Sequence, residues 1–204
     1  SRLMDLTPKT ASVLRDGAEV EIPVEEVKVG DRVALYQNYE RQEESGVYVD
    51  GQTYLPATWV DANLNERFYW DANEEILVYA LPEEIVKSDE TTVDEDGKKI
   101  LYRDGDAVYL SLALIQKYTD VRLQAYDGEA QKRVFVENNW DPVTVADAAW
   151  SAKIRLRGGL KSPIVTEIKR GGTVTVLEQY DNWARVMTPD GHIGYMHKWK
   201  MKNL

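Results

Sequence analysis

Carboxylate side chains are the groups in this sequence that could most directly do chemistry. Asp61, Glu66 and Asp71 follow one another closely along the chain. A pair of carboxyl groups is what a glycoside hydrolase uses as general acid and as base or nucleophile. Asp71 stands at an expected hairpin turn, where aspartate commonly accepts hydrogen bonds from the local backbone, and Glu66 stands at an expected helix end. The pattern favours structural roles, and we expect no catalytic residue in this chain.

The residues that most often bind metals or act as nucleophiles are scarce. The 204-residue chain has no cysteine and two histidines, His192 and His197, so the composition excludes disulfides, zinc–thiolate sites and cysteine nucleophiles. Asp94 and Asp96 precede Gly97, but the glutamate and flanking helices of a calcium loop are missing. Esterase, phosphate-loop and zinc-protease motifs are also missing. We therefore expect neither a metal nor a cofactor.

Charge is divided unevenly along the chain, whose net charge is −10. From Ala146 onward, ten Lys and Arg against five Asp and Glu give +5, which leaves 15 against 30, or −15, for residues 1–145. The acidic bulk argues against a nucleic-acid partner, whereas the basic end suits anionic wall polymers. Without a run of about 18 apolar residues, we also expect no membrane span.

The middle of the chain contains an internal repeat. Val47–Pro82 and Ile100–Asn138 align when Tyr54 is placed on Tyr109. Each unit predicts a two-stranded hairpin, a short helix begun by Pro56 or Ser111, and a second hairpin. The apolar helix positions recur at helical spacing, so one face of each helix must be buried. These apolar positions are Trp59, Val60 and Leu64 in one unit and Leu114, Ile115 and Tyr118 in the other.

The first repeat unit resembles the copper amine oxidase N-terminal-like domain of Firmicute surface proteins. The matching residues are Tyr54-Leu55-Pro56 and, after the helix, Tyr69-Trp70-Asp71-Ala72. Despite its name, that domain is not itself a copper site. The second unit resembles it more weakly, because Ser111 and Ala125 replace Pro56 and Trp70.

The C-terminal part of the chain resembles a bacterial SH3 domain, and five separated elements carry the resemblance. They are Ile154-Arg155, Ser162-Pro163-Ile164 with Ile168-Lys169-Arg170-Gly171, Val174 to Leu177, Asn182 to Val186, and Asp190 to Met196. The family usually has tryptophan where Tyr195 stands. A small barrel needs large residues to fill it, so we expect Trp183 in the core.

A third resemblance lies near the N-terminus. The segment from Val13 to Leu35 resembles the hairpin region of P-type ATPase actuator domains. The sequence shows neither an ATPase phosphorylation segment nor a membrane segment. We therefore discount this resemblance and expect only a β-hairpin there.

Together these features predict an α+β front region of two small antiparallel-sheet-plus-helix repeats, followed by an all-β SH3-like barrel. The front region spans residues 1–145, with repeat units at about 33–87 and 98–140 and a β-hairpin before them. The barrel spans residues 146–204. Trp140 to Trp150 connects the two and contains both a proline and apolar residues, so it could be a packed strand or a linker.

This order of units resembles the N-terminal region of secreted family-eighteen glycoside hydrolases from clostridia and bacilli, in which a chitinase-like catalytic barrel would follow. The acidic Asp-x-x-Asp-x-Asp-x-Glu signature of that barrel is absent. The resemblance implies a non-catalytic module, extracellular or wall-associated, of a larger hydrolase. Its partners would be peptidoglycan or another wall polymer and the downstream catalytic domain. We expect Tyr180, Asn182, His192 and Tyr195 to contact the ligand.

A structural role is the alternative interpretation. The repeats and the barrel would then form a spacer or docking platform for a missing catalytic domain, without a ligand of their own. In that case Trp150 and Trp199 would be interface residues rather than sugar-binding platforms.

Overall fold

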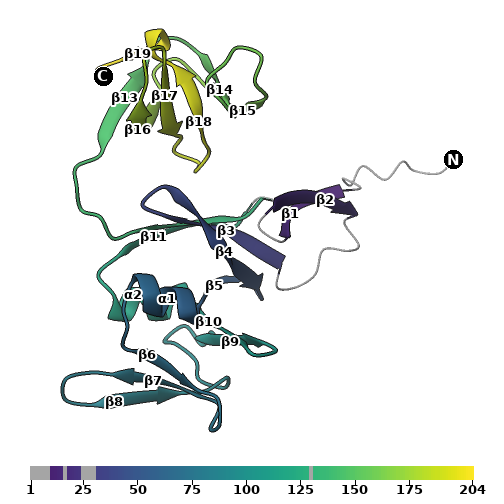
Figure 1. Ribbon diagram of the computed structural model, residues 1–204, viewed down its shortest axis with the longest axis vertical. Coiled ribbons are helices and arrows are strands. Elements are labelled where there is room, and N and C mark those ends of the chain that lie inside the picture. The colour runs from purple at the N-terminus through teal and green to yellow at the C-terminus, as the bar shows by residue number, and fades with distance from the viewer. Residues whose placement is uncertain (1–9, 16–17, 24–30, 129–130) are drawn as a thin grey trace, which may run out of the picture. The chain divides into compact units, whose positions relative to one another are not determined.

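The chain is mostly β-structure with few helices, which agrees with the predicted β-rich SH3-like region and only weakly with the predicted α+β front region. The computed structural model describes residues 10–15, 18–23, 31–128 and 131–204, with strands over 52% of the chain. Two short α-helices, α1 (Ala57–Asn63) and α2 (Leu112–Tyr118), occur in these residues. The chain divides into two units, Ser1–Asn139 and Trp140–Leu204 (Figure 1).

A nine-stranded sheet forms the frame of the first unit. Its strands run in the order β11-β12-β3-β4-β5-β10-β9, and off this path β1 pairs with β3 while β2 pairs with β1. All pairings are antiparallel except that of β12 with β3. The bounds are β1 Thr10–Arg15, β2 Ala18–Pro23, β3 Asp31–Gln37, β4 Glu40–Val49, β5 Gln52–Pro56, β9 Leu101–Asp104, β10 Ala107–Ser111, β11 Arg122–Tyr126 and β12 Arg133–Glu137.

An approximate two-fold axis relates β5 and α1 of the first repeat unit to β10 and α2 of the second. Adding 55 to the bounds of β5 and α1 (52, 56, 57 and 63) gives those of β10 and α2 (107, 111, 112 and 118). Strands β5 and β10 pair antiparallel with Leu55 opposite Leu110. Leu55 therefore pairs with the residue at the same position of the other repeat unit, which places the axis between Leu55 and Leu110.

The two repeat units differ after their helices. In the first, β6 (Phe68–Asp71) and β7 (Ile76–Ala80) continue into β8 (Ile85–Ser88) and form a separate three-stranded sheet. In the second, the β11–β12 hairpin joins the large sheet through β3. The repeat predicts a small sheet in each unit, whereas the structure has one large sheet shared by both, because strand β10 of one unit pairs with β5 of the other.

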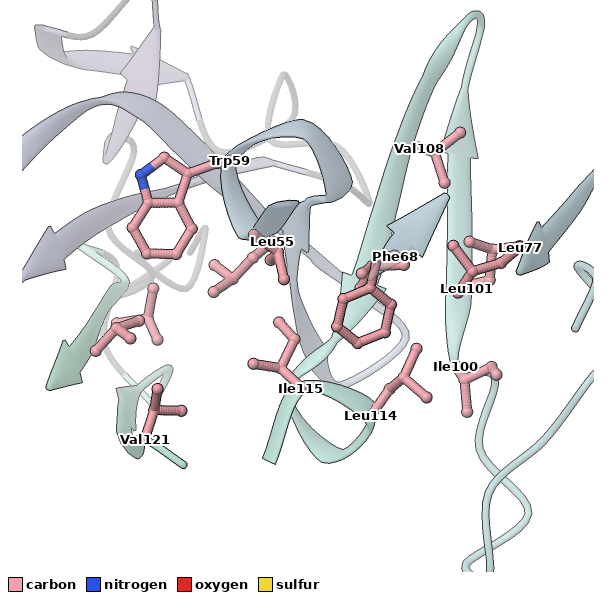
Figure 2. Close-up of a cluster of buried hydrophobic side chains, with 14 of the residues drawn as sticks. Leu55, Trp59, Phe68, Leu77, Ile100, Leu101, Val108, Leu114, Ile115 and Val121 are labelled. Atoms are coloured by element: carbon pink, nitrogen blue, oxygen red, sulfur yellow. The ribbon is translucent and has the colours of Figure 1, made fainter. Parts of the chain in front are cut away.

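Both helices bury the apolar faces that the sequence indicates. Trp59 and Val60 of α1 and Leu114 and Ile115 of α2 are buried, in one cluster with residues from both sheets. Figure 2 shows members of this cluster from the helices and the strands around them. Ser111 is the N-cap of α2 and accepts a hydrogen bond from the backbone N–H of Leu114 at 3.1 Å, as predicted.

The second unit is a seven-stranded antiparallel sheet with the order β15-β14-β18-β17-β16-β13-β19. Its core is built from small and medium side chains such as Ala184, Val186 and Met196. The bounds are β13 Thr144–Ala148, β14 Ala152–Arg155, β15 Ile164–Ile168, β16 Thr173–Gln179, β17 Trp183–Met187, β18 Ile193–His197, the 3-10 helix η2 Lys198–Lys200, and β19 Met201–Lys202.

The boundary between the units lies before β13. The predicted division between residues 145 and 146 falls inside this strand, yet all of β13 pairs with β16 and β19 of the second unit. The segment from Trp140 to Trp150 thus contributes a packed strand rather than serving only as a linker.

Replacement of Leu110 by alanine tests the importance of the axis. Leu110 is fully buried, so Leu110→Ala removes transfer free energy and leaves a cavity that costs roughly 2 to 5 kcal/mol. Urea unfolding followed by circular dichroism measures this loss. The control is Tyr69→Ala. Tyr69 also belongs to Ser1–Asn139 but is 64% exposed, so this substitution is expected to change the free energy of unfolding by about 0.5 kcal/mol or less. Equal effects of the two changes would contradict the proposed central position of Leu110.

Candidate functional site

The second unit carries an open hollow of about 550 Å³ on its surface. Strands β14, β15, β17 and β18, the loop between β14 and β15, and η2 contribute to it. Volumes of this size are typical of sites for small ligands or short polymer segments. The lining residues are Ser151, Ala152, Lys153, Arg155, Leu160, Glu167, Ile168, Lys169, Trp183, His197, Trp199 and Lys200.

Trp183 belongs to this hollow and not to the core. Along β17, Ala184 and Val186 are buried while Trp183 is only partly buried. Side chains of a strand alternate between its two faces, so Trp183 points away from the face on which Ala184 and Val186 pack. The prediction that Trp183 fills the barrel is therefore wrong.

Two tryptophans and a histidine form the apolar part of the hollow. The ring centroids of Trp183 and His197, which stand opposite each other on β17 and β18, lie 5.0 Å apart. His197 and Trp199 follow at 5.9 Å. Leu160 adds an exposed apolar side chain from the β14–β15 loop. In the same loop, a Cβ on Gly158 would come within 3.2 Å of the Trp183 ring, so glycine permits this close approach.

His197 has a polar atom that protein groups do not satisfy. Its Nδ1 is buried, and within the part of the chain that the structure describes it has no hydrogen-bond partner. A buried polar atom without a partner is costly. Trp183 and Trp199 on either side hold the ring in place. We call these three residues, Trp183, His197 and Trp199, the aromatic floor of the hollow.

Basic side chains surround this aromatic floor. Lys153, Arg155, Lys169 and Lys200 line the hollow together with one carboxylate, Glu167. Two of the cations are held by carbonyl groups of the domain itself, since Arg155 donates from Nη1 to the Ser162 oxygen at 2.8 Å and Lys200 donates from Nζ to the Ser151 oxygen at 3.1 Å. The arrangement can bind a ligand that offers both an apolar face and negative charge.

The structure brings together only two of the four residues predicted to contact a ligand. The rings of Tyr180 and Tyr195 lie 6.1 Å apart. The Tyr180 hydroxyl donates a hydrogen bond to the Glu178 carboxylate, and this bond raises the pKa of Tyr180 to about 12.

The other two predicted residues lie at opposite ends of the β17–β18 hairpin. Asn182 precedes β17 beside His197, and its carbonyl accepts from the Lys198 N–H at 2.9 Å. His192 lies in the turn at the far end, with Nδ1 3.1 Å from the Asp190 carboxylate. Neither residue, nor either tyrosine, is among those that line the hollow.

The signal that the sequence offered for the hollow is the alternation of residues in β14, β17 and β18. Lys153 and Arg155 alternate with buried Ala152 and Ile154. Given an inward-facing Ala184, the same rule would have placed Trp183 on the outer face. The contribution of Leu160 depends on the path of the β14–β15 loop, which the alternation does not determine.

The carboxylates of the first unit have local roles. Asp71 Oδ1 accepts from the backbone N–H of Asn73 at 2.9 Å and of Glu74 at 3.1 Å, as predicted for a turn residue. Asp94 Oδ1 accepts from Asp96 and Lys98 in the same way. Within the described ranges, no three acidic or histidine side chains gather where they could hold a metal ion.

A comparison with known protein families identifies most of the second unit. The family model for the bacterial SH3 domain matches residues 150–202. Residues 150–202 are a bacterial SH3 domain. The hollow therefore lies on an SH3 domain, and the resemblance seen in the sequence is confirmed for this part of the chain.

The N-terminal resemblance also has a match. The model for the P-type ATPase actuator domain matches residues 5–53. A probable copper-exporting P-type ATPase of Archaeoglobus fulgidus is 41% identical over 59 residues, which cover 29% of this chain and 7% of that protein. This chain thus matches a small part of the ATPase. In the described parts of the chain, no helix has the length and apolar character needed to cross a bilayer.

The outward position of Trp183 can be tested by comparing two substitutions in the SH3 domain. Ile154 is fully buried, so Ile154→Ala is expected to lower the free energy of unfolding by roughly 2 to 5 kcal/mol. Trp183→Ala leaves a surface depression and not a closed cavity, so we expect about 1 kcal/mol. Urea unfolding of both variants measures the difference. A loss for Trp183→Ala as large as that for Ile154→Ala would show that the indole is a core residue.

Proposed function

We propose that this chain is a non-catalytic module that binds cell-wall polymer through its SH3 domain and so positions a larger secreted hydrolase. Bacterial SH3 domains are commonly cell-wall binding modules. The observation that carries the proposal is the hollow with its floor of Trp183, His197 and Trp199 and its basic rim. Such a surface can bind a polymer without any reacting group.

The floor suits the flat apolar face of a sugar ring. Aromatic side chains combine a large apolar surface with few rotatable bonds, so they bind such a face at a low cost in conformational entropy. Trp199 is 62% exposed, which leaves its ring accessible to a long polymer. The open form of the hollow allows a chain to enter and leave at its ends.

We also propose a family for the front region and one for the parent protein. We assign the two repeat units to copper amine oxidase N-terminal-like repeats and the parent protein to the secreted family-eighteen glycoside hydrolases. The approximate two-fold relation of β5 and α1 to β10 and α2 supports a duplicated unit. The proposed location is extracellular or on the cell wall.

The alternative function is a spacer or docking platform for the catalytic domain. The exposed indole of Trp150, which the Arg170 guanidinium covers at 5.6 Å from the ring centre, favours this role as an interface residue. Comparison of the parent hydrolase with and without this chain separates the two functions. Activity lost on insoluble wall alone supports targeting, whereas activity lost on soluble substrate supports docking.

Retention on purified cell-wall sacculi tests the binding function. The full chain is expected to cosediment with sacculi at moderate salt, and Trp199→Ala is expected to weaken retention about tenfold because a stacking surface is removed. Tyr69→Ala is the matched control, since Tyr69 is as exposed as Trp199 but belongs to the first unit. The control should bind like the unchanged chain. Absence of retention of the unchanged chain would remove the targeting function.

A further inference from the structure

The charges that line the hollow indicate what kind of wall polymer it binds. Four cations, Lys153, Arg155, Lys169 and Lys200, stand against one carboxylate, Glu167, which leaves a surplus of three positive charges. Cations gathered around a depression raise the local concentration of anions and favour their binding. A neutral glycan would make no use of this surplus.

Two of the four cations are available to a ligand. Lys153 and Lys169 are exposed, and the described residues give neither ammonium group a hydrogen-bond or ion-pair partner. Glu167 stands opposite Lys153 in the β14–β15 pair, and Lys169 follows directly after the end of β15 at Ile168. Lys153 and Lys169 therefore come from different segments, one from β14 and one from the chain after β15. The free cations thus lie at separate points along the hollow.

The chemistry of these cations suits a phosphate group. An arginine fork binds a carboxylate or a phosphate bidentately, whereas lysine acts as a point charge that can bind a tetrahedral phosphate from many directions. The arginine of the hollow, Arg155, already donates to the Ser162 carbonyl. Both available cations are lysines.

We propose that the SH3 domain binds a wall glycopolymer that carries phosphodiester groups, with its sugar units over Trp183 and Trp199 and its phosphates at Lys153 and Lys169. This inference rests on the proposed wall-binding function and names the ligand of the same site. The aromatic floor supplies contact area, and the lysines select the charged polymer. Separated cations match a polymer that repeats one negative charge per unit.

The experiment compares walls with and without the phosphate polymer. Gram-positive walls are divided, and one part is treated with hydrofluoric acid, which cleaves phosphodiester bonds and leaves the peptidoglycan network. A third part has its carboxylates converted to neutral amides with a carbodiimide and ammonia. Cosedimentation of the full chain is then measured on all three preparations at several salt concentrations.

Two double variants of equal charge accompany these measurements. Lys153→Gln with Lys169→Gln removes the free cations of the hollow. Lys161→Gln with Lys202→Gln removes two exposed lysines of the same domain that do not line it. The first pair is expected to weaken binding to untreated walls about tenfold or more, and the control pair about twofold or less, because exposed charges that do not line the hollow contribute little in salt.

The outcomes separate this inference from the proposed function. Retention that is lost after acid treatment but kept after amidation supports a phosphate polymer. Retention that survives acid treatment overturns the inference, and its loss on amidation would identify carboxylates as the anion, while wall binding itself would stand. Equal weakening by the two double variants also overturns the inference. If untreated walls retain nothing, the proposed function fails as well.

Discussion

The alternation of side chains along the β17–β18 hairpin is the constraint on which the surface of the SH3 domain depends. Ala184 and Met196 pair across the two strands and face the core, so their neighbours Trp183 and His197 must pair on the outside. Small and medium residues suffice to fill this core, because strands β13 to β18 bring many of them together. The large aromatic rings are thereby left on the outer face, where they line the hollow. A shift of one residue in the register would bury the rings and destroy the hollow.

The front unit depends on a comparable constraint, the pairing of Leu55 with Leu110. Both side chains are fully buried, and the strands that carry them lead directly into α1 and α2. One antiparallel contact therefore fixes both helices on the same core. A second long-range contact closes the sheet, where Asn38 Oδ1 accepts the backbone N–H groups of Asn138 and Asn139 at 3.0 Å. These contacts join segments of the unit that are far apart in the sequence.

Local features of this fold could be predicted from the sequence, whereas long-range features could not. Turn residues predict the hairpins, and Pro56 and Ser111 predict where α1 and α2 begin. The ordered SH3 elements predict the second unit. The shared sheet depends on pairing β5 with β10 and on the parallel pairing of β12 with β3, which no local pattern indicates. The expectation that Trp183 fills the core rests on the size of its ring and is wrong, because Trp183 alternates with the buried Ala184 and so lies on the opposite face of the strand.

The division of charge between the two parts of the chain limits where an anionic polymer can bind. Residues 1–145 carry a net charge of −15 and residues 146–204 carry +5. The same polymer is attracted by the SH3 domain and repelled by the front unit, although screening confines both effects to about 8 to 10 Å at cellular salt. Under the proposed function, this division of charge favours contacts of an anionic polymer with the basic residues 146–204 over contacts with the acidic residues 1–145.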